Sequence, residues 1–174
     1  MARDILGISS VVRYLRNPNP RVTIKLLRAF GATVGHNTTI KRSLLLDNAY
    51  EDMNSVGDFS YLQIGNNCYI GDNSFFDLAN RILIEDNAVI SANASFITHA
   101  ECDRSSYLSV KFPRTCAPIV VKTGAWVGYG ATIFPGVTIG CHAVLGAHSL
   151  LLDNAEPGCL YIGVPARKFR HLEQ

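Results

Sequence analysis

Every sixth residue between positions 121 and 151 is aliphatic, namely Val121, Val127, Ile133, Ile139, Leu145 and Leu151. A period of six fits neither an α-helix, which repeats about every 3.6 residues, nor the simple alternation of a strand. It is typical of a short strand followed by a turn, repeated many times. Three such units form a triangular coil of about 18 residues, and the coils must stack because none can bury its core alone.

The same phase extends upstream, at Val34, Ile40 and Leu46, at Ile64, Ile70 and Phe76, and at Ile84, Ile90 and Phe96. It is interrupted by a poorly phased stretch at 47–63, a slip at 77–83 and an excursion at 99–118. Stacked coils pair their backbones about 4.8 Å apart, with the aliphatic side chains inside. We therefore predict three inward ladders, formed by residues 84, 121 and 139, residues 90, 127 and 145, and residues 96, 133 and 151.

The first thirty residues are predicted to be helical. Residues 4–17 place Ile5, Ile8, Val12 and Leu15 at helical spacing with Arg13 and Arg16 turned away, and Asn17 and Pro18 end the pattern. A second helix over about 21–30 would put Val22, Leu26 and Phe30 on one side and end at Gly31. The predicted organisation is a basic helical segment at 1–30 followed by a β-helix at 31–170.

Charge is distributed unevenly along the chain. Residues 1–42 hold eight basic residues and one acidic residue, a formal charge of +7, which leaves −5 for the rest of a chain whose net charge is +2. A basic start suggests an anionic partner surface, such as a membrane that carries glycans, or simply a helix that caps the stack. Nucleic acid is not expected, because no aromatic residues are interleaved to stack on bases.

The bulk sequence excludes several classes of protein. No apolar run approaches 18 residues, and the N-terminus makes a poor signal peptide, so we expect a cytoplasmic protein, with its basic start at the inner face of the membrane as a further expectation. The five cysteines are odd in number and include no CxxC pair, which argues against a disulfide framework and a zinc site.

Three segments carry a family resemblance. Residues 124–140 (GAWVGYGATIFPGVTIG) contain a WIG…PGVTIG-like pattern, residues 163–167 read GVPAR, and Phe96-Ile97-Thr98-His99 precedes the excursion. Residues 34–170 thereby resemble the hexapeptide-repeat acyltransferases, in particular the galactoside, maltose and polysaccharide O-acetyltransferases. The resemblance implies an all-β fold, a left-handed parallel β-helix, although the general rule for parallel crossovers favours right-handed connections. It also implies a homotrimer with active sites between subunits.

His99 is the predicted catalytic residue. His99, His142 and His148 each follow an inward residue by three positions, so each is expected at a corner of the prism, on a different edge. Only after His99 does the chain leave the repeat, and loops on rigid scaffolds collect functional groups. The family resemblance also assigns the catalytic base to His99. An imidazole with a pKa near 6.5 suits proton transfer from a sugar hydroxyl, and Glu101 or Asp103 could orient the ring.

The remaining site residues come from the resemblance. It implies acetyl-CoA as co-substrate, no metal, and an oxyanion contact from the backbone N–H of Tyr129. Cofactor contacts fall on Trp126, Ala147, Arg167 and Arg170, with the arginines as phosphate partners. The sequence departs from the family at Leu152-Asp153, where a Thr-Lys pair is usual. Asp77 and Asn80 are expected on the side of the acceptor.

The leading hypothesis is therefore an acetyl-CoA-dependent O-acetyltransferase that acts on a sugar or polysaccharide precursor. An N-acetyltransferase of an amino sugar and a non-catalytic β-helix scaffold remain alternatives. A γ-type carbonic anhydrase would need three zinc-binding histidines, which here fall on three different edges. Serine acetyltransferases and sugar nucleotidyltransferases carry further domains that this chain lacks.

Overall fold

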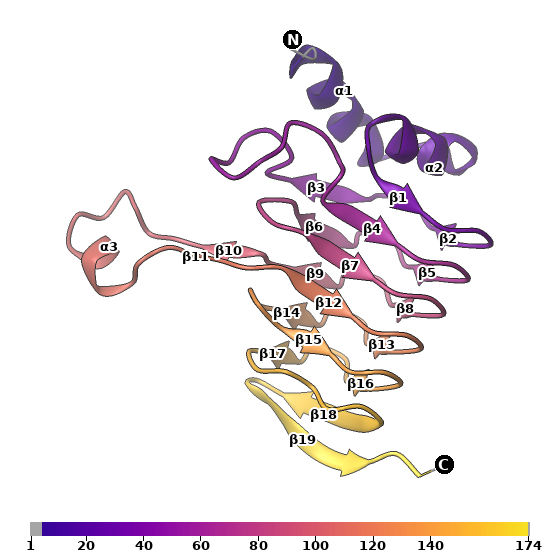
Figure 1. The fold of residues 1–174 in the computed structure, drawn as a ribbon, viewed down its shortest axis with the longest axis vertical. Helices are drawn as coiled ribbons and strands as arrows, with labels where there is room; N and C mark the ends of the chain where they lie inside the picture. Colours follow the sequence, from indigo (N-terminus) through magenta and orange to yellow (C-terminus); the bar gives the residue numbers. More distant parts are fainter. Residues whose placement is uncertain (1–4, 174) are drawn as a thin grey trace.

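In a computed structural model that describes residues 5–173, the chain forms a prism of stacked triangular coils (Figure 1). The 30-residue start contributes two helices, α1 (Ile5–Leu15) and α2 (Pro20–Ala29), which cover the N-terminal end of the stack. Residue 4, where the first helix was expected to begin, lies outside the described residues. The C-terminus lies at the opposite end of the prism.

Three parallel sheets form the three faces of the prism. The first face contains β1 (Thr33–Val34), β4 (Leu62–Ile64), β7 (Ile82–Ile84), β12 (Ile119–Val121) and β15 (Thr138–Ile139). The second contains β2 (Thr39–Ile40), β5 (Tyr69–Ile70), β8 (Val89–Ile90), β13 (Trp126–Val127), β16 (Val144–Leu145) and β18 (Cys159–Gly163), followed by antiparallel β19 (Ala166–His171). The third contains β3 (Leu45–Asp47), β6 (Phe75–Asp77), β9 (Ser95–Phe96), β14 (Thr132–Ile133) and β17 (Leu150–Leu151).

The strand register confirms the predicted ladders. Ile84 pairs with Val121, which pairs with Ile139, on the first face. The corresponding ladders of the second and third faces also align, and their members are all buried: residues 90, 127 and 145, and residues 96, 133 and 151. Each such side chain contributes about 1.5–3 kcal/mol relative to an exposed position. The core is therefore a continuous column of aliphatic and phenylalanine side chains.

The corners between the strands depend on residues that tolerate a left-handed backbone. Asn67, Asn73, Asn87 and Asn93 have φ between 54° and 60°, and His142 and His148 have φ of 55°. Asparagine adopts this region more readily than most residues. The corners also pack closely: a Cβ on Gly128 would lie 2.6 Å from the backbone nitrogen of Ala147 in the next coil. Tight turns therefore set the spacing of the regular coils.

The helices are part of the same core. Ile8, Val12 and Leu15 are buried as predicted, and α1 contacts β3 while α2 contacts β1. The side of α2 that carries Val22, Leu26 and Phe30 is only partly covered, whereas Thr23 and Leu27 are fully buried. Threonine can occupy this face because its hydroxyl donates to the carbonyl oxygen of Asn19, at 3.4 Å.

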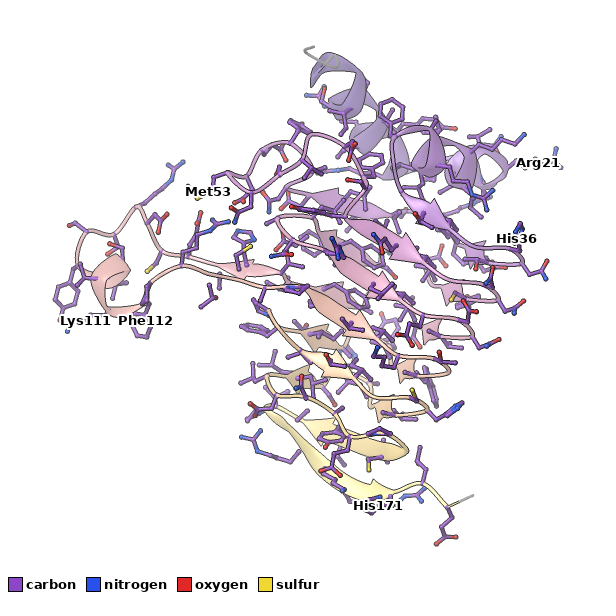
Figure 2. The ribbon with its side chains drawn as sticks, in the orientation of Figure 1. Arg21, His36, Met53, Lys111, Phe112 and His171 are labelled. Atoms are coloured by element: carbon purple, nitrogen blue, oxygen red, sulfur yellow. The ribbon has the colours of Figure 1, made fainter. Side chains whose placement is uncertain are left out.

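The excursion is an ordered arm. β10 (His99–Ala100) and β11 (Thr115–Cys116) pair antiparallel, and the short helix α3 (Leu108–Lys111) lies between them. The arm projects from one side of the prism, with Lys111 and Phe112 far from the body (Figures 1 and 2). The loop that contains Met53 extends from the same side. Two of the three interruptions in the repeat therefore project from the prism in the same direction.

Candidate active site

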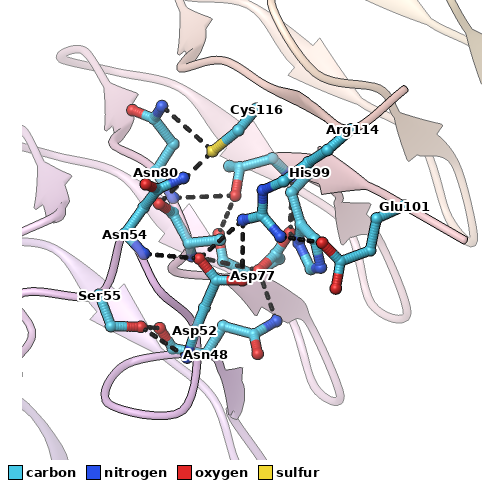
Figure 3. Close-up of polar contacts among 12 residues, drawn as sticks. Asn48, Asp52, Asn54, Ser55, Asp77, Asn80, His99, Glu101, Arg114 and Cys116 are labelled. Atoms are coloured by element: carbon cyan, nitrogen blue, oxygen red, sulfur yellow. Dashed lines mark hydrogen bonds and ion pairs between the residues drawn. The ribbon is translucent and has the colours of Figure 1, made fainter. Parts of the chain in front are cut away.

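The three interruptions of the six-residue period meet at one edge of the prism. Leu46, Phe76 and Phe96 stack in register on the third face, and each is followed by a departure from the repeat. The first departure is the irregular loop at 48–61, the second begins at Asp77, and the third is the arm that begins at His99. Side chains from all three departures lie together in Figure 3.

His99 lies at the base of the arm. It is the first residue of β10 and pairs with Cys116, so it does not occupy a tight corner as His142 and His148 do. Its side chain is half-buried, with 21% of its surface exposed. Antiparallel pairing holds its backbone, because the peptide N–H of Ala117 donates to the carbonyl oxygen of neighbouring Thr98 at 2.9 Å. The imidazole is therefore presented from a rigid position at the edge of the core.

Asp77 orients the imidazole. Its Oδ2 lies 2.6 Å from His99 Nδ1 and also accepts hydrogen bonds from the backbone N–H groups of Thr98 and His99, at 2.9 and 3.0 Å. Its Oδ1 accepts from Asn48 Nδ2 at 2.9 Å and from the N–H of Ala79 at 3.2 Å. Five donors thus surround a carboxylate that is only 1% exposed.

The electrostatics of the pair fix the tautomer of the histidine. Burial acts to raise the pKa of Asp77, but the hydrogen bonds from Asn48, His99 and Ala79 outweigh it and hold that pKa below its ordinary value. The ionised carboxylate accepts a hydrogen bond from Nδ1–H, so in the neutral imidazole the free lone pair lies on Nε2. The arrangement gives a base at Nε2 and a buried negative charge that stabilises the imidazolium once it forms.

The expected acceptor contacts occupy different roles in the structure. Asp77 was expected on the acceptor side, yet it lies beneath His99 and makes the orienting contact that was expected of Glu101 or Asp103. Asn80 is partly buried; its N–H donates to Thr98 Oγ1 at 3.0 Å, and its side chain reaches Cys116 Sγ at 3.5 Å. Asp103 is exposed on the arm. The sequence does not predict the contact between Asp77 and His99, because Asp77 follows Phe76 at the slip, where the six-residue period is interrupted.

A second set of charged residues adjoins His99, and no periodic pattern in the sequence predicts it. Arg114 Nη2 lies 2.7 and 2.8 Å from the two carboxylate oxygens of Asp52, and Arg114 Nη1 contacts Glu101 Oε2 (Figure 3). Asp52 belongs to the irregular loop, and Arg114 directly precedes β11, the returning strand of the arm. The ion pair therefore joins two segments that are 62 residues apart in the sequence.

The residues implied for the cofactor lie on or beside the second face. Trp126 is 51% exposed in the outward row of β13, and its Nε1 donates to Ser91 Oγ at 3.0 Å. Tyr129 is half-exposed and makes an edge-to-face contact with His148, with ring centroids 5.2 Å apart. Ala147 is an exposed corner residue. Among the described residues, no hydrogen bond or ion pair joins this group to His99.

The two arginines of the cofactor set project from β19. Arg167 and Arg170 are exposed, and Arg167 Nη1 lies 3.7 Å from Asp153 Oδ2. Asp153 is the residue that departs from the Thr-Lys pattern of the family. Because both partners are exposed, the ion pair contributes little stability, but the carboxylate reduces the positive potential available to a phosphate.

Two groups of side chains have spacing that could suit a metal ion. Asp52, His99 and Glu101 bring one potential ligand atom each within 4.8 Å of one another, as do Glu156, Cys159 and His171. A cation already occupies each neighbourhood, Arg114 in the first and Lys168, 2.6 Å from Glu156, in the second. Neither group contains more than one histidine, so neither fits the three-histidine zinc site of the carbonic anhydrase alternative.

Comparisons with known proteins agree with this architecture. The galactoside O-acetyltransferase of Escherichia coli is 27% identical over 155 residues, which cover 84% of this chain and 67% of that protein. A maltose O-acetyltransferase from Clostridium difficile 630 superimposes with a TM-score of 0.80 at 21% identity, covering 99% of this chain and 88% of the other. A galactoside acetyltransferase in complex with coenzyme A superimposes with a TM-score of 0.79 at 24% identity, covering 99% of this chain and 84% of the other.

A shorter match reaches an acetyltransferase-type protein of Schizosaccharomyces pombe, with 38% identity over 56 residues, which is 32% of this chain but only 27% of that protein. No protein-family model matches the chain. The structural likenesses confirm the predicted fold class, a left-handed parallel β-helix built from hexapeptide repeats. The predicted resemblance to the galactoside and maltose O-acetyltransferases is confirmed as well.

Proposed function

We propose that this chain is an acetyl-CoA-dependent O-acetyltransferase that acetylates a hydroxyl of a sugar or polysaccharide precursor. The observation that carries the proposal is the buried Asp77–His99 pair, which leaves His99 Nε2 as a base at the edge where the repeat breaks. Relatives named as galactoside and maltose O-acetyltransferases, and a coenzyme A complex among the similar structures, support the reaction class and the co-substrate.

The proposed reaction is a direct transfer. His99 Nε2 removes the proton of the acceptor hydroxyl as its oxygen attacks the thioester carbonyl of acetyl-CoA. The tetrahedral oxyanion accepts a hydrogen bond from the backbone N–H of Tyr129. The C–S bond then breaks, and the imidazolium returns its proton to the CoA thiolate. Asp77 stabilises the imidazolium throughout. Because the acceptor oxygen attacks acetyl-CoA directly, this proposed route forms no acyl-enzyme and requires no metal ion.

Two surfaces support a trimer in which active sites form between subunits. The outward row of the second face exposes Tyr69, Val89 and Trp126, which lie in register on neighbouring strands. The arm exposes Tyr107, Val110 and Phe112. Exposed apolar groups of this kind mark interaction surfaces. A neighbouring copy would bring its Trp126 and Tyr129 toward His99, and light scattering of the purified protein measures the predicted threefold mass.

Membrane contact is a separate part of the proposal. Arg13, Arg16 and Arg21 are exposed on or beside the helices at the N-terminal end of the prism, where an anionic leaflet would attract them. No helix in the described part of the chain has the length and apolar character needed to cross a bilayer. We expect a cytoplasmic enzyme that binds peripherally to vesicles containing anionic lipid, and deletion of residues 1–20 should reduce co-sedimentation.

A screen for thiol release tests the proposed activity. Acetyl-CoA is offered with sugar hydroxyl acceptors, amino sugars and no acceptor, and free CoA is measured with a thiol reagent. Turnover with hydroxyl acceptors is the expected result, whereas turnover with amino sugars alone would favour the N-acetyltransferase alternative. A protein whose melting temperature does not respond to coenzyme A and that releases no thiol would be a scaffold, contrary to the proposal.

A further inference from the structure

His99 is bordered by charged groups that the proposed reaction does not use. A carboxylate oxygen of Asp52, a ring nitrogen of His99 and a carboxylate oxygen of Glu101 lie within 4.8 Å of one another. Glu101 is the more exposed of the two acids, with 33% of its side chain accessible against 6% for Asp52. Asp52 is therefore the charge that the structure holds in a fixed position beside the base.

Arg114 fixes Asp52. Its guanidinium contacts both carboxylate oxygens of Asp52, while the backbone N–H of Asn54 donates to Oδ1 at 2.8 Å. Burial acts to raise the pKa of Asp52, but these hydrogen bonds and the charge of Arg114 lower it, so the carboxylate is ionised. Arg114 Nε is buried without a hydrogen-bond partner among the described residues. Stability alone does not explain an arginine that is partly buried and has an unsatisfied buried donor.

The charges around the imidazole do not balance. Asp77, Asp52 and Glu101 supply three carboxylates and Arg114 one guanidinium, which leaves two uncompensated negative charges around a neutral His99. An acceptor that carries its own carboxylate next to the reacting hydroxyl would be repelled here. A neutral polyol could instead donate a neighbouring hydroxyl to Asp52, and a hydrogen bond to a charged acceptor is stronger than one to a neutral group.

We propose that Asp52, held by Arg114, binds the acceptor by accepting a hydrogen bond from a hydroxyl next to the reacting one, and that it selects neutral glycosides over uronic acids. This inference rests on the proposed function. Arg114 acts as a positioning residue, since its contact with the acceptor runs through Asp52. The irregular loop and the arm thereby form one wall of the acceptor site.

The test compares matched acceptors with variants that differ in one charge. Methyl β-D-galactopyranoside and methyl β-D-glucopyranoside are offered with acetyl-CoA beside the corresponding uronic acids, and transfer is followed by mass spectrometry. Asp52→Asn should raise the KM for the neutral glycoside about tenfold. It should also reduce the ratio of kcat/KM for the neutral glycoside to kcat/KM for the uronic acid by about the same factor. The KM for acetyl-CoA should change less than about twofold, because the phosphate-binding arginines lie elsewhere.

Two further variants separate a binding role from a structural one. Arg114→Lys keeps the cation but loses the two-pronged contact, and it should raise the acceptor KM by about threefold to tenfold. Glu85→Gln removes one carboxylate from a different ion pair, with Lys122, and should leave the ratio of neutral to acidic acceptors unchanged. If Asp52→Asn unfolds at the assay temperature, Arg114→Lys is compared with wild type in its place, through the acceptor KM and the ratio of neutral to acidic acceptors.

The outcomes distinguish this inference from the proposed function. Two results would overturn the role of Asp52 alone. The first is a wild-type protein that binds coenzyme A but uses neither neutral glycoside. The second is a set of variants that bind acetyl-CoA normally and keep the wild-type acceptor KM and selectivity. Wild-type protein that neither binds coenzyme A nor releases thiol overturns the proposed function and this inference with it. A raised acceptor KM with a reduced preference for the neutral glycoside supports both.

Discussion

The edge that follows the third face is built in two ways along the prism. In the coils that contain β3, β6 and β9, this edge holds the irregular loop, the slip at Asp77 and the arm. In the coil that contains β14, the same edge is a tight turn at Phe134-Pro135-Gly136, with Gly136 at φ 83°. The inward residues Phe96 and Ile133 lie in register on adjacent strands and are equally buried. The irregular segments that carry the proposed site are therefore added at the edge without altering the core.

The buried polar groups show the same contrast. In the regular coils, buried polar atoms mostly serve the turns, as where Ser74 Oγ donates to the carbonyl oxygen of Gly71 at 2.9 Å. At the irregular edge, a buried carboxylate collects five donors and faces a histidine. An ionised group that is this buried costs free energy unless its donors are all in place. Its presence in the core marks the edge as a site and not merely as scaffold.

The largest effect at this edge, apart from removing the imidazole itself, should follow loss of the Asp77 charge. Asp77→Asn can donate to Nδ1 and so favour the wrong tautomer, and we expect kcat to fall about 10²- to 10³-fold. Asp47→Asn is the matched control, because Asp47 pairs in register with Asp77 on β3 but is exposed. Steady-state kinetics at saturating acetyl-CoA measure both variants. An Asp77→Asn enzyme within threefold of wild type would show that the pair does not orient the base.

The regular coils should respond in stability and not in chemistry. Ile70→Ala removes a fully buried side chain from β5, and it should lower the free energy of unfolding by about 2–5 kcal/mol while kcat per folded molecule is retained. Met53→Ala, at an exposed position of the irregular loop, should change stability by less than about 0.5 kcal/mol. Denaturant titration measures both. Equal losses in the free energy of unfolding for Ile70→Ala and Met53→Ala would contradict the division between the regular coils as scaffold and the irregular edge as site.

The buried carboxylate also predicts a pH dependence of stability. Because the pKa of Asp77 is lower in the folded protein than in the unfolded chain, its charge stabilises the fold above the unfolded value of about 3.9, and this contribution is lost as the pH falls through the folded pKa. The stability advantage of wild type over Asp77→Asn should decrease as the pH falls below about 4. An advantage that is independent of pH would mean that Asp77 contributes through packing alone.

A smaller loss of stability than that of Ile70→Ala is expected at a regular corner. Asn73 has φ of 55°, a conformation that costs most residues about 1 kcal/mol. Asn73→Ala should lower the free energy of unfolding by about that amount, whereas Asn73→Gly should be tolerated because glycine adopts this region freely. Chemical denaturation compares the two variants. A larger loss for glycine than for alanine would show that the asparagine side chain, and not its backbone, matters at this corner.

Much of this architecture follows from the sequence because a period of six leaves few choices. Val121 and Ile139 are 18 residues apart and pair on one face, as phase alone predicts. His99 is identifiable for the same reason, since it follows an inward residue by three positions and lies beside a break, although the structure places it on β10 and not at a tight corner. The sequence does not predict that Asp77 lies beneath His99, or that Asp52 meets Arg114. Those contacts depend on where aperiodic loops fold back, and loop paths are set by tertiary contacts that no repeat encodes.

The most direct test compares two histidines that follow inward residues at the same spacing, one at the irregular edge and one at a regular corner. His99→Ala should lower kcat at least about 10³-fold in a protein that remains folded, because it removes the base and leaves the coils intact. His142→Ala, at an exposed corner with φ of 55°, should keep kcat within about twofold. Comparable activity in the two variants, measured with the same acceptor at saturating acetyl-CoA, would contradict the assignment of the active site to the break in the repeat.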